Sequence, residues 1–247
     1  QNFLINGGIY KKIVAALELT PEDTIIEVGP GLGTLTEFLA ATGAKIIAIE
    51  KDYLLADYLK KRFVNSKNVM IVEDDVLRFN HKDTRYKIQD TRYKVVGNIP
   101  YYLTSHLLRT IFEKWPQFQL AILMLQKEVA QRICAKPPNM SLLAVSVQYY
   151  SQPKIISYVS GGSFYPPPDV DSAIVKLVVS DQFSVVSKKI ATGNWKLETG
   201  NFFKIVRAGF AGKRKQLGNN LAGGLKLAKG FVEGKLKSIS IDPTRRA

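Results

Sequence analysis

An amide, a proline and two aromatic rings follow an apolar run of the chain, in the stretch GNIPYY at residues 97–102. The side-chain oxygen of Asn98 and the carbonyl of Ile99 or Pro100 can accept both hydrogens of an exocyclic amine such as adenine N6. Pro100 has no N–H, so it adds no competing donor, and Tyr101 can stack on an unstacked base. Such an amine is a poor nucleophile, and acceptors that favour its pyramidal geometry would help it to attack a methyl sulfonium. The stretch therefore indicates methylation of a base amine.

A second aromatic side chain, Phe164, lies in the Gly- and Pro-rich stretch GGSFYPPPDVDS at residues 161–172. Its ring can cover the same base from the opposite side, or it can anchor the loop in the core. We expect Asp171 and Ser172 to fix this loop to the strand that follows. The stretch around Asn98 also has a purely structural alternative, a strand-to-helix turn in which the amide caps the helix.

Three glycines at alternate positions, Gly29, Gly31 and Gly33, follow the first predicted strand and precede a helix that is expected to begin near Thr34. Glycine lets the backbone approach a ligand closely, and a helix N-terminus offers unpaired N–H groups. The dinucleotide fingerprint G-x-G-x-x-G would require a glycine in place of Thr34. The loop therefore predicts a nucleotide cofactor site, with Gly29 and Gly31 in contact, that does not grip a pyrophosphate.

Two carboxylates follow at the ends of the next two predicted strands. Glu50 ends the second strand, where a carboxylate can accept hydrogen bonds from both hydroxyls of a ribose. Asp75 ends the third strand and can accept the exocyclic amino group of a cofactor adenine, with Asp74 as an adjacent alternative. Together with the glycines, these acids predict a pocket for an adenosine without phosphates.

The fold must bring these strand ends together. Seven short apolar runs rich in β-branched residues predict strands, and they begin at Thr24, Lys45, Val69, Lys94, Leu120, Ile155 and Ala173. The first five runs are separated by helix-length segments, which is typical of a parallel sheet covered on both faces. The last two predict an antiparallel hairpin that closes the sheet. The expected fold is α/β, a seven-stranded Rossmann-like sheet with a small helical domain after it.

The C-terminal part of the chain differs from the rest in pattern and charge. After Val179 the strand pattern stops, so we predict one domain at residues 1–180 and a helical domain at residues 181–247. From residue 202 onward, eleven Lys and Arg face two acids, a balance of +9 within a net charge of +14. Such clustering favours a polyanionic partner, although a solvated helical face is the alternative. The candidate contacts to such a partner, RNA among them, are Lys213, Arg214 and Lys215.

The composition excludes several other classes of protein. No apolar run approaches the roughly 18 residues that cross a bilayer, so no membrane partner is expected. The single cysteine, Cys134, cannot form an internal disulfide, and with only His81 and His106 beside it we predict no metal site. This cysteine usage favours a reducing, cytoplasmic compartment. Nothing in the sequence indicates an obligate oligomer, and we expect a monomer.

The successive motifs of the chain resemble those of the ribosomal RNA small-subunit adenine N6-dimethyltransferase family, the KsgA type. The resemblance covers nearly the whole chain and is carried by QNFL, EVGPGLGTLT, AIEKD, EDDVL, NIPYYLTS, LMLQKEVAQRI, SFYPPPDVDSAIVKL and FFKIVRAGFAGKRKQLGNNL. It implies S-adenosylmethionine as the methyl donor. The positions that match the family's cofactor-contacting motifs are Asn2, Leu4, Gly29, Glu50, Asp75 and Asn98.

The resemblance also implies a substrate. It implies two successive methylations of each of two neighbouring adenines near the 3′ end of small-subunit ribosomal RNA, on the RNA or on the small subunit during ribosome maturation. Two departures from the family pattern stand out. The basic segment that precedes QNFL in the family does not precede it here, and the pentapeptide DTRYK occurs at residues 83–87 and again at residues 90–94. We expect the duplication to lengthen a surface loop without functional effect.

Three other functions fit parts of the pattern. A large-subunit ribosomal RNA adenine methyltransferase of the macrolide-resistance type would resemble the chain in its catalytic domain. A non-catalytic RNA-binding assembly or transcription factor on the same fold would show no turnover and would tolerate loss of Asn98. A nicotinamide dehydrogenase is disfavoured by Thr34 and by the absence of a histidine suited to hydride transfer.

Overall fold

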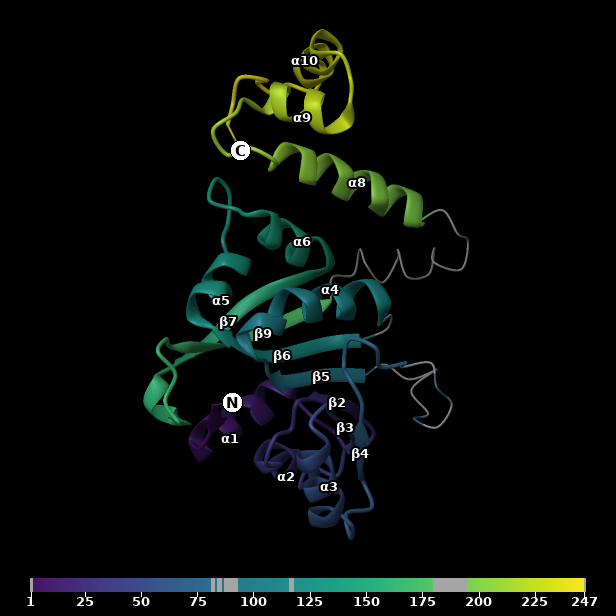
Figure 1. Ribbon diagram of the computed structural model, residues 1–247, viewed down its shortest axis with the longest axis vertical. Helices are drawn as coiled ribbons and strands as arrows, with labels where there is room; N and C mark the ends of the chain where they lie inside the picture. The colour runs from purple at the N-terminus through teal and green to yellow at the C-terminus, as the bar shows by residue number, and fades with distance from the viewer. Residues whose placement is uncertain are drawn as a thin grey trace.

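The computed structural model describes residues 2–80, 83, 86, 93–115, 118–179 and 195–246, without the side chains of residues 101 and 195–199. Seven strands form one mixed sheet in the order β4-β3-β2-β5-β6-β9-β7 (Figure 1). The strands are β2 (Thr24–Val28), β3 (Lys45–Glu50), β4 (Val69–Glu73), β5 (Tyr93–Asn98), β6 (Phe118–Gln126), β7 (Ser151–Val159) and β9 (Ser172–Val179). The predicted seven-stranded α/β fold is confirmed.

The pairing of these strands follows the sequence pattern. The five strands β4, β3, β2, β5 and β6 are parallel to one another, as their continuous apolar runs predict. β9 lies antiparallel to both β6 and β7, so the later strand of the closing pair is inserted between β6 and β7. The carboxyl ends of the parallel strands therefore meet at one edge of the sheet, where the candidate site residues lie.

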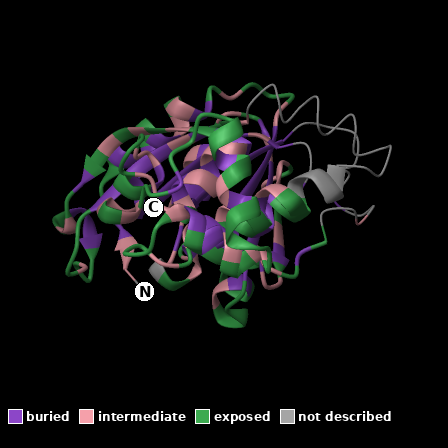
Figure 2. Ribbon diagram, turned by 90° about the horizontal axis from the view of Figure 1, so that it is seen from above, coloured by how far each residue is buried: buried purple, intermediate pink, exposed green. Residues whose placement is uncertain are grey.

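Helices cover the sheet on both faces. They are α1 (Gly7–Leu17), α2 (Thr34–Ala40), α3 (Tyr53–Arg62), α4 (Thr104–Lys114), α5 (Lys127–Ile133) and α6 (Leu142–Tyr150). Neighbouring residues of one strand face opposite sides, so Ile25 belongs to the core under α1 and α2, and Ile26 to the core under α4, α5 and α6. Figure 2 shows the resulting pattern, with buried strands between helices that carry exposed faces. Two buried cores therefore hold the sheet rigid at the site edge.

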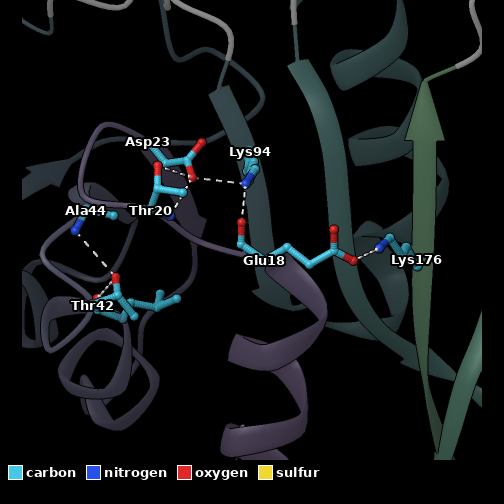
Figure 3. Close-up of polar contacts among 8 residues, drawn as sticks. Glu18, Thr20, Asp23, Thr42, Ala44, Lys94 and Lys176 are labelled. Carbon is cyan, nitrogen blue, oxygen red and sulfur yellow. Dashed lines mark hydrogen bonds and ion pairs between the residues drawn. The ribbon is translucent and has the colours of Figure 1, made fainter.

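A polar cluster at the opposite edge anchors α1 to the sheet (Figure 3). The ammonium of Lys94 donates to the carbonyl of Glu18 at 2.8 Å and pairs with Asp23 at 3.0 Å. Lys176 on β9 pairs with the carboxylate of Glu18 at 2.7 Å. Lys94 is buried, and an unpaired buried charge is costly, so these partners are required. They fix the helix that follows the N-terminal segment of the candidate site.

A second, two-stranded sheet was not predicted. β1 (Phe3–Leu4) pairs antiparallel with β8 (Phe164–Tyr165), in the register Phe3 with Tyr165 and Leu4 with Phe164. The N–H of Ile5 continues this contact by donating to the carbonyl of Ser163 at 2.9 Å. The pairing joins the N-terminal segment to the Pro-rich loop, which lie far apart in the sequence.

Three further helices follow the sheet, α8 (Trp195–Gly209), α9 (Leu217–Leu225) and α10 (Lys229–Ser238). α8 lies against α6 (Figure 1), where the rings of Phe202 and Tyr149 stack with centroids 4.5 Å apart. The three helices also share a small core of their own, made of Ala208, Leu221, Val232 and Leu236. The predicted domain boundary between residues 180 and 181 lies outside the described residues.

The duplicated pentapeptide lies for the most part outside the described residues. Tyr86 of the first copy is buried, and its ring lies against Phe79 with centroids 4.9 Å apart. Tyr93 and Lys94 of the second copy belong to β5. At least these three residues therefore contribute to the folded body.

Gly97 in β5 has no room for a side chain. A Cβ there would lie 2.6 Å from the carbonyl oxygen of Val28 on β2 and 2.8 Å from Cδ1 of Ile99. We expect Gly97→Ala to lower the free energy of unfolding by about 1–3 kcal/mol, because the neighbouring backbone must shift. Urea denaturation measures this difference. Gly7→Ala, whose Cβ would meet nothing within 4 Å, is the matched control, and equal stability of the two variants would contradict the tight contact.

Candidate active site

A cavity of about 550 Å³ opens at the carboxyl ends of β2 and β5. The predicted site residues that line it are Asn2, Leu4, Gly29, Gly31, Asn98, Pro100 and Phe164. They come from the N-terminal segment, the glycine loop, the end of β5 and β8, four segments that are distant in the sequence. The volume is within the range of about 300–1,000 Å³ that is typical of small-molecule sites. The structure thus brings the candidate cofactor loop and the candidate catalytic stretch to one cavity.

The glycine loop requires glycine for two different reasons. Gly29 has a φ of 65°, which L side chains rarely adopt, and a Cβ there would meet nothing within 4 Å. The space that a side chain would occupy at Gly29 is therefore open to a ligand. Gly33 has a φ of 79° and lies before α2, where a Cβ would come within 2.6 Å of Leu59. Gly33 thus allows close packing of the loop on α3.

Glu50 ends β3 and is 4% exposed. One carboxylate oxygen accepts the N–H of Gly31 at 3.1 Å, and the other accepts the N–H of Asp52 at 3.0 Å. Each oxygen keeps capacity for a further hydrogen bond, so the carboxylate is fixed beside the glycine loop and can still accept two ribose hydroxyls. Glu50 does not line the 550 Å³ cavity. A cofactor that reaches it must extend past the cavity along the sheet edge.

Asp75 lies after β4, at the next position along the same edge. Its Oδ1 accepts the N–H of Leu77 at 3.0 Å, and its Oδ2 pairs with Lys51 at 2.9 Å. The hydrogen bond from Lys51, together with the one from Leu77, holds the pKa of the Asp75 carboxyl below its ordinary value. The carboxyl is therefore ionised and a good acceptor for an amino group. Asp74 instead accepts the N–H of Asp75 at 2.7 Å, and neither acid lines the cavity.

Asn98 ends β5 with its amide at the cavity wall. Its Nδ2 donates to the carbonyl of Asn2 at 3.4 Å, and Oδ1 has no donor among the described residues. The amide does not cap α4, because that helix begins at Thr104 and has no side-chain cap. The cap alternative is therefore wrong, and the amide oxygen remains available to a ligand.

The two backbone carbonyls after Asn98 differ in their partners. The carbonyl of Pro100 accepts the N–H of Leu103 at 2.9 Å and so closes the short 3₁₀ turn at Tyr101–Leu103. No hydrogen bond to the carbonyl of Ile99 occurs within the described part of the chain, and the N–H of Ile99 is held by Met124 at 3.1 Å. Of the two carbonyls named in the sequence analysis, that of Ile99 is the better second acceptor.

The aromatic residues around the cavity have different surroundings. Phe164 is 4% exposed and belongs to the core under α1, so it anchors the loop as well as lining the cavity. The ring of Tyr101 lies outside the described side chains. Tyr102 lines the cavity, and 82% of its surface is exposed. The sequence analysis did not name Tyr102 as a site residue, because nothing in the sequence distinguished it from its neighbour Tyr101.

Asp171 fixes the loop as expected, because its carboxylate accepts the N–H of Gly161 at 3.3 Å.

Glu27 is a site residue that the sequence analysis missed. It lies inside β2 with 1% exposure, lines the cavity, and accepts the hydroxyl of Thr36 at 2.7 Å. Burial raises the pKa of the Glu27 carboxyl to about 8. The hydrogen bond from Thr36 opposes this increase, and the charge of Glu50 adds to it. The carboxyl is therefore protonated at neutral pH and offers both a donor and an acceptor to the cavity.

The raised pKa of Glu27 predicts a pH dependence of stability. In the unfolded chain the ordinary pKa is 4.5 and in the folded chain about 8, so the folded state holds one more proton between these values. The stability that this proton contributes is complete below pH 4.5 and is lost as the pH rises toward 8. For each pH unit between these two pKa values, we expect the free energy of unfolding of the wild type to fall by up to about 1.4 kcal/mol more than that of Glu27→Gln.

Urea denaturation of both proteins at pH 5, 6, 7 and 8 measures this difference. The amide introduced by Glu27→Gln can still accept the Thr36 hydroxyl but does not titrate, so the variant is matched to the wild type. Parallel curves for the two proteins would contradict the buried, protonated carboxyl.

The three candidate RNA contacts lie in the turn between α8 and α9. Lys213, Arg214 and Lys215 are all exposed, and none forms an ion pair with another described residue. The turn is held by Asn220, which is 4% exposed and donates to the carbonyls of Gly209 and Gly212 at 2.8 and 2.9 Å. The sequence gave no sign of this role of Asn220. A rigid turn thus presents three adjacent positive charges to solvent.

Comparison with known proteins shows the family. The family model described as "Ribosomal RNA adenine dimethylase" matches residues 1–243. The chain belongs to this family. The resemblance stated from the motifs is therefore confirmed. Membership of this family identifies S-adenosylmethionine as the cofactor.

Two relatives match the whole length of this chain. The ribosomal RNA small subunit methyltransferase A of Dehalococcoides mccartyi (strain CBDB1) is 44% identical, over 100% of this chain and 81% of the relative. The protein of the same name from Geobacillus kaustophilus (strain HTA426) is 38% identical, over 100% of this chain and 83% of the relative.

Two solved structures resemble the structure of this chain over nearly its whole length. A dimethyladenosine transferase from Plasmodium falciparum has a TM-score of 0.78 at 26% identity, covering 99% of this chain and 91% of that one. The 23S rRNA methyltransferase ErmE has a TM-score of 0.73 at 24% identity, covering 99% and 92%. At the latter identity the likeness concerns the fold alone.

The residues present fit S-adenosylmethionine. Gly29 leaves open space at the loop, Glu50 offers two carboxylate oxygens beside it, and Asp75 is an ionised acceptor further along the edge. The cavity continues from the loop to Asn98. This arrangement suits an adenosine along β3 and β4 with its sulfonium end toward β5.

Proposed function

We propose that the chain transfers methyl groups from S-adenosylmethionine to N6 of two neighbouring adenines near the 3′ end of small-subunit ribosomal RNA, giving N6,N6-dimethyladenosine. The observation that carries the proposal is the single cavity that joins the glycine loop to the amide of Asn98. The names of the relatives, ribosomal RNA small subunit methyltransferase A, support the choice of subunit.

The chain's own residues prepare the amine for attack. The Asn98 amide is held through its Nδ2 by the carbonyl of Asn2, so its Oδ1 points to a defined position. That oxygen and the carbonyl of Ile99 accept the two hydrogens of N6 and favour the pyramidal nitrogen. When bound, S-adenosylmethionine supplies the methyl group as an electrophilic sulfonium. The methylated nitrogen then carries a positive charge and loses its proton to water, so no ionisable base is required.

Other residues of the cavity position the base. Pro100 keeps the strand end free of a competing N–H, and Phe164 forms a rigid apolar wall. Tyr101 is proposed to stack on the base that leaves the RNA stack. After the first methylation only one N–H remains, so one of the two acceptors is released while the other orients the second attack.

The cofactor contacts follow the same assignment. We propose that Gly29 and Gly31 contact the methionine part, Glu50 the ribose and Asp75 the adenine, with Asn2 and Leu4 closing the cavity from the N-terminal segment. Tyr10 supports this segment, because its hydroxyl donates to the carbonyl of Leu4.

We propose that the chain binds the small-subunit RNA or the maturing small subunit itself. We also propose that it does so as a monomer in the cytoplasm. Lys213, Arg214 and Lys215 would contact the phosphates of the RNA. In the described part of the chain, no helix has both the length and the apolar character to cross a membrane. Within the same residues, no group of three or more His, Cys, Asp or Glu could hold a metal ion.

The alternative substrate is large-subunit RNA, because the ErmE structure shares the fold. The decisive experiment supplies labelled S-adenosylmethionine to small-subunit particles lacking the modification and, in parallel, to large-subunit RNA, and identifies the modified nucleosides by mass spectrometry. Dimethyladenosine in the small-subunit sample alone is the expected result. Label confined to the large-subunit RNA would overturn the choice of substrate, and no label in either sample with bound cofactor would favour a non-catalytic assembly factor.

A further inference from the structure

A second cavity, of about 900 Å³, lies between α4, the α5–α6 connection, α6 and α8. It shares no lining residue with the cavity that contains Asn98. Its lining residues come from these helices, and Figure 1 shows α8 beside α6, so the cavity lies where the C-terminal helices meet the sheet body. Of its lining residues, only Lys213 has a part in the proposed function, as a candidate RNA contact.

The floor of this second cavity is aromatic. Phe112 on α4, Tyr150 on α6 and Phe203 on α8 line it and are at most 8% exposed. The rings of Phe112 and Tyr150 stack with centroids 5.0 Å apart, and those of Tyr150 and Phe203 with centroids 5.7 Å apart. These contacts hold the floor in a fixed shape across three helices. The part of this floor that faces the cavity is therefore a preformed apolar surface.

The rim of the second cavity is cationic. Arg109, Arg132, Arg207 and Lys213 line it, against the single acid Glu113. Arg109 pairs with Glu113 at 3.0 Å, and Arg132 pairs with Glu128 at 3.0 Å. Arg207 and Lys213 form no ion pair with any described residue. An occupant with one or two negative charges would complement these two side chains.

We propose that the second cavity binds one unpaired nucleotide of RNA, with its base on the aromatic floor and its phosphate at Arg207 and Lys213. An apolar planar group joined to an anion is what the floor and the rim together accept, and proteins bind unstacked RNA bases on aromatic rings beside Arg and Lys. The proposal rests on the proposed function in taking RNA as the partner and Lys213 as one of its phosphate contacts. It adds an RNA contact outside the reacting cavity.

The test uses the full chain and a fluorescein-labelled single-stranded RNA of eight nucleotides, followed by fluorescence anisotropy. Ser146→Phe places a ring inside the cavity, and Arg207→Ala removes the unpaired cation. We expect each variant to weaken RNA binding about 5- to 100-fold, the range of one stacked base, with unchanged affinity for S-adenosylhomocysteine and unchanged Tm. Lys237→Ala on α10 is the charge-matched control and should bind the RNA nearly as the wild type does.

Three results would overturn the proposal. RNA binding by Ser146→Phe at the control level, with weakened binding by Arg207→Ala, would mean a surface phosphate contact with no base in the cavity. Both variants binding like the control would exclude any contact. An amphipathic Glu-rich peptide of 15 residues that binds the wild type but neither variant, with RNA binding unaffected, would assign the cavity to a protein partner. Failure of the proposed function is distinct, because it is measured in the methyl-transfer assay, as the absence of dimethyladenosine from the small-subunit sample.

Discussion

The Asn98→Ala variant is expected to transfer methyl groups to small-subunit particles about 10²- to 10³-fold more slowly than the wild type, the usual loss when one preorganised polar contact to a transition state is removed. The amide oxygen has no other described donor and lies at the cavity wall. Alanine removes the acceptor without adding volume. The rate at saturating cofactor and particle measures the effect.

The controls for Asn98→Ala separate chemistry from binding. RNA affinity should be unchanged, and Asn219→Ala, which removes an exposed amide on α9, should keep the wild-type rate. Wild-type methylation by Asn98→Ala would contradict the mechanism and would favour an acceptor set that lacks this side chain. Loss of RNA binding along with activity would indicate a structural role instead.

Replacing Lys213, Arg214 and Lys215 together by alanine is expected to weaken binding to small-subunit particles by about 10- to 100-fold and to reduce the slope of log K against log salt by about 2–3. The three charges are exposed and adjacent on a turn that Asn220 holds in place. Each charge that meets a phosphate releases a counterion, so the slope counts the contacts. Affinity for S-adenosylhomocysteine should not change.

The chain offers a matched control for this substitution. Lys60, Lys61 and Arg62 are consecutive on α3 and carry the same three charges, but each pairs with an acid, namely Glu73 at 2.8 Å, Asp57 at 2.6 Å and Glu37 at 2.8 Å. Their replacement by alanine changes the net charge equally and should leave the salt slope nearly unaltered. Equal effects of the two triple variants would mean that net charge, and not the turn, governs binding.

Much of the sheet could be predicted because its central strands are buried on both faces. A strand such as β2 must then be mostly apolar, here with Thr24 and Glu27 as exceptions, and its apolar run differs clearly from the turns on either side. The insertion of β9 between β6 and β7 was not predicted, although the apolar run of β9 is typical of an inner strand and the alternating pattern of β7, with Pro153, is typical of an edge strand. The β1–β8 pair has two residues on each side, too few for any periodicity to appear.

The predictable part of the candidate site is the part built on strand ends. Gly29 and Asn98 follow apolar runs, so their place at one edge is a consequence of parallel pairing. Glu27 was missed because a single acid inside an apolar strand belongs to no recognisable motif. The only sequence signal was that a charged residue is unusual in a buried strand. The second cavity depends on how α8 packs against α6, through the rings of Phe202 and Phe203. No local sequence pattern predicts this contact between distant segments.

The structure of the chain in complex with S-adenosylhomocysteine tests the central claim most directly. The account predicts the adenosine along β3 and β4, the ribose hydroxyls within hydrogen-bond distance of Glu50, and the sulfur inside the 550 Å³ cavity facing the amide of Asn98. A ligand bound away from this cavity, or bound there with its adenine toward Asn98 and no contact to Glu50, would contradict the account.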